Sequence, residues 1–113
     1  MKLETFVDIL KTRDLVEEEM RLFNEKMQNL MGEDSLCMYY KPMEMLNDLI
    51  EKILVNEMGE STEGAEWFIY DGIEQIKNEG TKISEKNEND TDKVWKINSY
   101  EDYYTYLSEV CEK

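Results

Sequence analysis

Apolar side chains recur every three to four residues along the first third of the chain, which is typical of amphipathic helices. The first stripe consists of Leu3, Phe6, Val7 and Leu10. It breaks at the polar run 11–14, where Asp14 followed by Glu17 resembles a capping box that can restart a helix. A second stripe follows at Met20, Phe23, Met27, Leu30 and Met31. We therefore expect a kink or tight joint near residue 12, and then a helix that ends before Gly32.

The clearest stripe lies in the middle of the chain, after Pro42, a residue suited to the first turn of a helix. Its members follow one another at spacings of one, three and four: Leu46, Leu49, Ile50, Ile53, Leu54 and Glu57. This pattern predicts an amphipathic helix that ends at Gly59. The connection before it, residues 33–40, contains the apolar run 36–40, which we expect to lie against the core.

Residues 65–70, Ala-Glu-Trp-Phe-Ile-Tyr, fit two structures. As a strand they form a short aromatic run, whereas as a helix they continue at helical spacing through Ile73 and Ile76 to Gly80. We favour the helix. The strand remains the alternative, because a short apolar run does not by itself distinguish the two.

Two short segments, 81–85 and 93–97, flank a polar tract and predict a β-hairpin, since residues 93–97 alternate between polar and apolar side chains. Ser99 with Asp102 forms another capping box and opens a C-terminal helix. The buried stripe of that helix is Tyr103, Tyr106, Leu107 and Val110. The whole pattern predicts one mostly helical α+β domain over residues 1–113, with a small β-hairpin and a C-terminal helix.

Composition agrees with a folded domain and narrows its chemistry. The 113 residues are 41% hydrophobic and include two Trp, seven Tyr and three Phe, which is more than an acidic disordered tail carries. Asp and Glu number 27 against 13 Lys and Arg, and His is absent, so the net charge is −14. Without His the chain lacks the usual general base near neutral pH and the imidazole metal ligand. We therefore expect that the protein is not an enzyme and has no catalytic residues.

Motifs for cofactors and metals are weak. Glycine-rich phosphate-binding motifs are absent from the sequence. A calcium-loop spacing is present at Asn87, Asn89 and Thr91, but the glycine and the closing Glu of such a loop are missing. Carboxylates beside the aromatic block are more simply a solvated helix face: Glu66, Asp71 and Glu74. We expect no cofactor and no metal.

The two cysteines, Cys37 and Cys111, are far apart and have no metal-ligand spacing. The N-terminal segment carries Glu4 and Asp8 and lacks the apolar centre of a signal peptide. No window approaches the roughly 18 apolar residues of a membrane span. We therefore expect a soluble cytoplasmic protein with reduced thiols and no membrane partner.

The net charge suggests two kinds of function. Duplex DNA carries one charge per about 1.7 Å of axis, so a net charge of −14 matches roughly 24 Å of duplex. However, residues 1–60 carry 14 acids and 7 bases, and residues 61–113 carry 13 and 6, so each half has a net charge of −7. Such interspersed bases are typical of an ordinary soluble surface. We expect a neutral or basic protein partner and no direct nucleic-acid binding; the alternative is an acidic nucleic-acid mimic that inhibits a host nucleic-acid-binding or defence protein.

Aromatic side chains supply the candidate partner-binding residues, because Trp and Tyr are typical interface anchors. The tyrosines of the C-terminal helix span more than half of its circumference, so at least one of them faces solvent, a partner or another chain. The predicted partner-binding residues are Glu66, Trp67, Tyr70, Asp71, Tyr103 and Tyr104. The partner is an unidentified protein, and a second copy of the chain is a further candidate.

Four segments carry a resemblance. They are Leu-Lys-Thr-Arg-Asp at 10–14, Tyr-Tyr-Lys-Pro at 39–42, Glu-Trp-Phe-Ile-Tyr at 66–70 and Ile-x-Ser-Tyr-Glu-Asp-Tyr-x-x-Tyr-Leu at 97–107. In this order they resemble a family of small, functionally uncharacterised phage and prophage proteins. The chain departs from the family where Asp71-Gly72 follows the aromatic block directly. The resemblance implies a cytoplasmic setting in a bacterial host and supplies no activity, so we expect a non-enzymatic phage or prophage protein that acts through protein–protein interaction.

Overall fold

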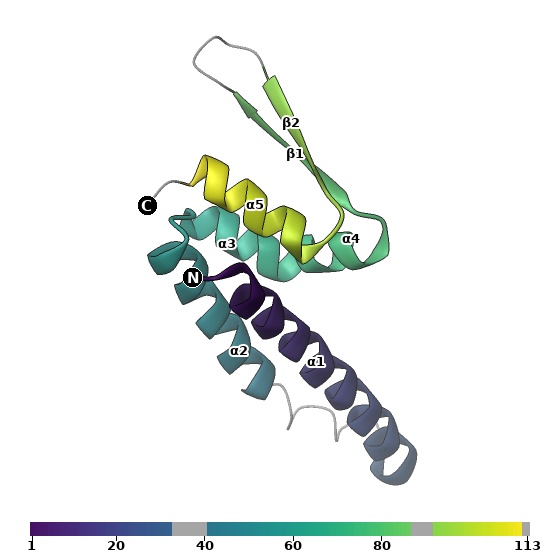
Figure 1. Cartoon of the computed structure of the whole chain (residues 1–113). Helices are drawn as coiled ribbons and strands as arrows, with labels where there is room; N and C mark the ends of the chain where they lie inside the picture. Colours follow the sequence, from purple (N-terminus) through teal and green to yellow (C-terminus); the bar gives the residue numbers. More distant parts are fainter. Residues whose placement is uncertain (33–40, 87–91, 112–113) are drawn as a thin grey trace.

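Two antiparallel helices form one end of the molecule, a third helical segment crosses them, and a β-hairpin projects from the other end (Figure 1). The structure is a computed structural model that describes residues 1–32, 41–86 and 92–111. Its elements, with η for a π-helical segment, are α1 (Leu3–Met31), α2 (Lys41–Lys52), η2 (Ile53–Glu57), α3 (Thr62–Trp67), η3 (Phe68–Gly72), α4 (Ile73–Asn78), β1 (Thr81–Lys86), β2 (Asp92–Ile97) and α5 (Tyr100–Val110). The predicted mostly helical α+β fold is confirmed, including its hairpin and its C-terminal helix.

The predicted kink near residue 12 is wrong, because α1 is one continuous helix of 29 residues. Asp14 does not cap a second helix. Its carboxylate accepts a hydrogen bond from the Tyr100 hydroxyl, with 2.6 Å between the two oxygens. Thr12 donates its hydroxyl to the Asp8 carbonyl oxygen within α1. The polar run 11–14 therefore stays helical, because Asp14 bonds to Tyr100 of α5 and Thr12 bonds within α1, and neither side chain caps a new helix.

Helix α2 has Pro42 in its first turn, as predicted, and continues directly into η2. The glycines that end the two N-terminal helices both have positive φ angles, 90° at Gly32 and 80° at Gly59, which other residues rarely adopt. The buried members of the predicted stripe are Ile50, Ile53 and Leu54. Leu49 is instead 47% exposed, because it lies at the edge of that stripe.

Residues 62–78 form a continuous helical rod made of α3, η3 and α4, so the strand alternative for this segment is wrong. Ser61 caps the rod, and its hydroxyl oxygen accepts a hydrogen bond from the Gly64 N–H at 3.0 Å. The rod ends before Gly80, whose φ is 81°. A Cβ atom at this position would lie 2.1 Å from Oδ1 of Asn98, so the turn into β1 requires glycine.

Strands β1 and β2 pair antiparallel, with Ile83 opposite Trp95 and Thr81 opposite Ile97. Ile97 is buried, and Ile83 and Trp95 pack against the core. Val94, on the other face, is 52% exposed. The predicted hairpin and the half-buried alternation of its second strand are therefore confirmed.

Helix α5 begins at the predicted capping box. The Ser99 hydroxyl accepts a hydrogen bond from the Asp102 N–H at 3.1 Å, and the Asp102 carboxylate accepts one from the Asn98 N–H at 3.0 Å. The buried residues of α5 are Tyr100, Tyr103, Tyr106 and Leu107. Val110, predicted for the same stripe, is 37% exposed at the end of the helix.

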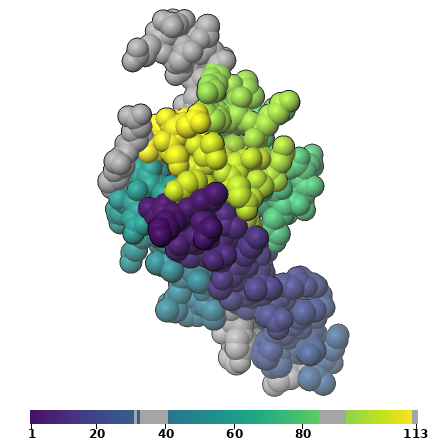
Figure 2. Space-filling model, viewed as in Figure 1, coloured from purple at the N-terminus to yellow at the C-terminus, as the bar shows by residue number. Residues whose placement is uncertain are grey.

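One hydrophobic cluster joins side chains from all helical segments and from β2, for example Phe6 of α1, Ile50 of α2, Phe68 of η3 and Ile97. The outer part of α1 lies beyond this cluster, and Leu30 near its end is 80% exposed. Figure 2 shows this part projecting from the body of the molecule. The molecule is accordingly elongated, with principal extents of 59 × 25 × 23 Å.

Candidate functional site

The aromatic block 66–71 lies on the rod, and its side chains point to opposite sides of that rod. Tyr70 lines a pocket with residues of α1, whereas Trp67 lines a cavity with residues of β1 and α5. Gly72 leaves room for the rings of Trp67 and Phe68 to lie against the backbone at position 72. A Cβ atom at Gly72 would be 3.0 Å from the Trp67 ring and 3.1 Å from the Phe68 ring. The predicted site residues are therefore divided between two surfaces.

An exposed tyrosine with carboxylates around it forms the first surface. Tyr70 is 72% exposed. The exposed acids Glu66 and Glu74 lie four residues before and after it on the rod, and Asp71 lines a shallow pocket together with Glu74. We call Glu66, Tyr70, Asp71 and Glu74 the acidic tyrosine patch. Among the described residues, none of these four side chains has a hydrogen-bond or ion-pair partner.

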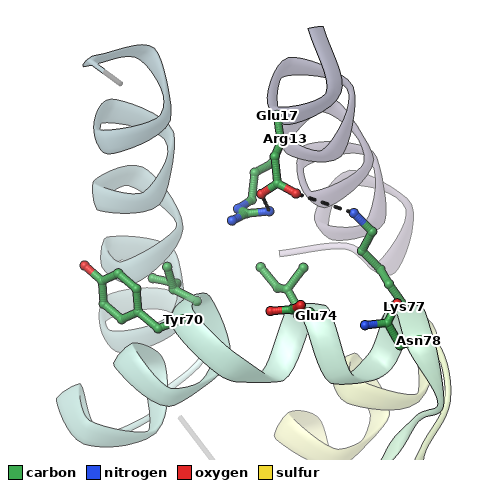
Figure 3. A pocket seen from close by; sticks show the side chains of 8 residues that line it. Arg13, Glu17, Tyr70, Glu74, Lys77 and Asn78 are labelled. Atoms are coloured by element: carbon green, nitrogen blue, oxygen red, sulfur yellow. Dashed lines mark ion pairs between the residues drawn. The ribbon is translucent and has the colours of Figure 1, made fainter. Parts of the chain in front are cut away.

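The pocket beside Tyr70 has a volume of about 330 Å³ and lies between α1 and the rod (Figure 3). Arg13 and Glu17 enter it from α1, and Glu74 and Lys77 border it from the rod. Two positive and two negative side chains thus line one pocket. The formal charge of the pocket is balanced, whereas the acidic tyrosine patch, which shares Tyr70 and Glu74 with it, carries only negative charges.

Four charged side chains form a charge cluster, and three of them line this pocket: Arg13, Glu17 and Lys77, with Asp14 as the fourth member. Nη1 of Arg13 lies 3.1 Å from a Glu17 carboxylate oxygen and 3.5 Å from Oδ1 of Asp14. Nζ of Lys77 lies 3.7 Å from carboxylate oxygens of both acids. Nε of Arg13 donates a hydrogen bond to Oδ1 of Asn47 at 3.0 Å. The charge cluster therefore connects α1 with both α2 and α4.

Burial makes the charge cluster sensitive to the loss of any member. Arg13 is only 6% exposed. Although their distances are those of ion pairs, Nη1 of Arg13 and Oδ1 of Asp14 make no hydrogen bond within the described part of the chain. The Tyr100 hydroxyl extends the cluster to α5, and burial, followed by the hydrogen bond to Asp14, raises the pKa of Tyr100 well above its usual range. These groups hold α1, α2, α4 and α5 together.

The two predicted tyrosines of α5 have different environments. Tyr104 is half-buried, and its hydroxyl donates to the Met1 carbonyl oxygen at 2.6 Å. Tyr103 is 1% exposed, and its ring stacks on Phe68 with 4.0 Å between the centroids. Tyr103 therefore does not belong to a surface that can dock a protein, which corrects the prediction. The physical reason is that its side of α5 faces the rod.

The charge cluster and Tyr100 were not among the predicted residues. One signal was present in the sequence: Arg13 follows Leu10 by three positions and therefore continues the apolar stripe of α1. A cation on a buried stripe needs a partner. The identity of that partner depends on how α1 packs against the rod and α5. The spacing of apolar residues along the sequence does not define this packing.

Several predictions concern residues outside those described: the core contact of 36–40, the chemistry of Cys37 and the tract 87–91. Within the described ranges, no three Cys, Asp or Glu side chains are grouped as a metal site would require. None of the helices in these ranges combines the length and the apolar character of a membrane span.

No family model, curated protein or solved structure matches this chain. The resemblance to phage and prophage proteins stays a prediction.

Proposed function

We propose that this protein is a non-enzymatic protein-interaction factor whose acidic tyrosine patch binds a protein with a basic surface. The observation that carries this proposal is the 72% exposure of Tyr70 between carboxylates that have no partner among the described residues. Tyrosine contributes large contact area with few rotatable bonds, and partnerless carboxylates attract Lys and Arg side chains. The phage or prophage origin and the cytoplasmic location stay predictions.

The rigid setting of the patch supports the same proposal. Tyr70 lies in the middle of the rod, between the buried residues Ile69 and Ile73. Lys77 and Arg13, the nearest cations that line the pocket, already contact Asp14 and Glu17 of the charge cluster. They therefore do not neutralise the patch. Its local charge remains negative, which favours a basic partner over a neutral one.

The alternative, a nucleic-acid mimic, has less support. A mimic needs a continuous row of carboxylates with few cations near them. Along α1, Arg21 lies within ion-pair distance of Glu18 and Glu25, and Lys93 of β2 lies 3.8 Å from Glu109 of α5. The carboxylates of these elements thus alternate with cations, so we keep mimicry as a prediction and prefer the protein-interaction factor.

Affinity capture from a bacterial lysate tests the proposal. We expect immobilised wild-type protein to retain a specific basic protein, and Tyr70→Ala to lose it. A double variant, Glu66→Gln with Glu74→Gln, should weaken retention and reduce its dependence on salt, because exposed charges are screened at high ionic strength.

Leu15→Ala is the matched control, because Leu15 is a large side chain that is 68% exposed on α1, away from the patch. It should retain the same protein as the wild type. The proposal fails if folded wild-type protein retains nothing specific, or if Tyr70→Ala retains the same protein equally well.

A further inference from the structure

The hydroxyl of Tyr103 is a buried polar group without a partner. Tyr103 is 1% exposed, and within residues 1–32, 41–86 and 92–111 its oxygen makes no hydrogen bond. Burial, and in second place the charge of Glu60, raises the pKa of Tyr103 far above its usual range, so the group is a neutral hydroxyl near neutral pH. A buried hydroxyl that is left unpaired destabilises the folded state, which makes it a candidate for contact with a ligand.

Tyr103 lines a cavity of about 520 Å³ between α3, β1 and α5. This volume lies in the range of small-molecule sites in proteins. The lining residues include Trp67, Glu60 and the polar residues Gln75, Thr81 and Ser84. The cavity therefore combines one large apolar surface with several donors and acceptors of hydrogen bonds.

Local structure holds the Glu60 carboxylate in place. Its Oε1 accepts a hydrogen bond from the Ser61 N–H at 2.8 Å, while Oε2 has no hydrogen-bond partner among the described residues. The carboxylate lies against Gly64, where a Cβ atom would come within 2.5 Å of its Cδ. Glycine at position 64 therefore leaves the space that this carboxylate occupies at the cavity wall.

The donors and acceptors of the cavity restrict the class of ligand. The Tyr103 hydroxyl has a proton to donate, and Oε2 of Glu60 can only accept. An ammonium group has no acceptor for Tyr103, whereas a carboxylate or phosphate group would be repelled by Glu60. Lys82 also borders the cavity, and its charge balances that of Glu60. A neutral ligand is therefore favoured.

We propose that this cavity binds a sugar ring. A sugar hydroxyl can accept from Tyr103 and donate to Glu60 at the same time, neighbouring hydroxyls reach Gln75 and Thr81, and the C–H face of the ring packs on Trp67. The sugar is either a free monosaccharide or one residue of a longer glycan. This site is separate from the acidic tyrosine patch and does not depend on the proposed function.

Titration of ¹⁵N-labelled protein with saccharides tests the proposal. The probes are glucose, galactose, mannose and N-acetylglucosamine, each with its β1,4-linked disaccharide, at millimolar concentration. We expect at least one probe to shift the indole N–H signal of Trp67. Tighter binding of a disaccharide indicates a glycan, and equal binding indicates a free sugar. Tyr103→Phe should weaken binding by roughly five- to tenfold, the effect of one hydrogen bond, and Glu60→Gln should weaken it too.

Glu63→Gln is the matched control, since Glu63 is an exposed acid in the first turn of α3, three residues after Glu60, and does not line the cavity. It should bind as the wild type does. The sugar proposal is overturned if no saccharide shifts the Trp67 signal, if folded Tyr103→Phe binds with wild-type affinity, or if n-butylammonium shifts the signal more than every sugar.

Discussion

Tyr100 and Tyr103 lie less than one turn apart on α5, and both are buried, yet their hydroxyl groups have opposite environments. The Tyr100 hydroxyl donates to Asp14 of the charge cluster at 2.6 Å. The Tyr103 hydroxyl has no partner among the described residues, and the Tyr103 residue is one of those that line the cavity beside Trp67. The element that faces each tyrosine makes the difference, because α1 provides a carboxylate and the rod provides Phe68.

This difference separates a region whose polar groups are paired with one another from a region where a buried polar group is left unpaired. In the charge cluster every ion has a counter-ion, and the contacts join the four helices α1, α2, α4 and α5. At the cavity lined by Trp67 and Tyr103, the Tyr103 hydroxyl has no hydrogen-bond partner among the described residues. Stability measurements can therefore distinguish the two regions before any ligand is identified.

Removal of Asp14 should have the largest effect. Asp14→Ala leaves the buried guanidinium of Arg13 with one fewer counter-ion and deprives the Tyr100 hydroxyl of its acceptor. We expect a loss of about 3 kcal/mol in the free energy of unfolding, measured by urea denaturation. Asp8→Ala removes an exposed acid of the same helix whose carboxylate makes no hydrogen bond or ion pair with the described residues, and it should change this free energy by less than about 0.5 kcal/mol. Equal effects of the two substitutions would contradict a structural role for the charge cluster.

The two tyrosines can be compared directly by removing only their oxygens. Tyr100→Phe should lower the free energy of unfolding by about 2 kcal/mol, because it removes a hydrogen bond to a charged acceptor. Tyr103→Phe should leave it unchanged or raise it by up to about 1 kcal/mol, since no hydrogen bond is lost. Both values come from the same denaturation experiment. A similar loss in both variants would indicate that Tyr103 has a partner after all, and the contrast between the regions would disappear.

The smallest effect is a shared dependence on alkaline pH. The pKa values of Tyr100 and Tyr103 are both raised in the folded state, so the folded chain keeps two protons that unfolded tyrosine releases near pH 10. This contribution to stability is fully present below about pH 10 and is lost as the pH rises above it. Unfolding free energies between about pH 9 and 11 should fall, and either Phe variant should remove roughly half of the part that comes from these two residues. An unchanged slope in Tyr103→Phe would show that its hydroxyl ionises as readily in the folded protein.

Periodicity and capping predicted the elements well. The apolar stripes, Pro42 and the box of Ser99 with Asp102 define helices and their ends through local geometry, which a sequence contains. The same reasoning gave a wrong prediction at Asp14. Its spacing from Glu17 resembles a capping box, but its carboxylate instead accepts a hydrogen bond from Tyr100, which lies 86 positions away in the sequence. Long-range contacts decided that case.

The candidate site was predicted in part. The exposure of Glu66, Tyr70 and Asp71 follows from the spacing of Ile69, Ile73 and Ile76. The separation of Trp67 from Tyr70 did not follow, since it depends on how α1, β1 and α5 surround the rod. The π-helical turn of η3 could not be predicted either, because a change from i→i+4 to i→i+5 hydrogen bonding requires no particular residue type and leaves no signal in the sequence.

Because the outer part of α1 projects from the core, the backbone hydrogen bonds in the two halves of this helix should open at different rates. Near Leu10 the helix is buried in the core, so we expect hydrogen exchange of its backbone amides to require unfolding of the whole domain. Near Leu30 no member of the hydrophobic cluster formed by the described residues opposes fraying, and the pairs of Arg21 with Glu18 and Glu25 are exposed. Amide protection should thus decline along α1 from its first half to its last turn, so that a single element belongs to the most slowly and the most rapidly exchanging parts of the molecule.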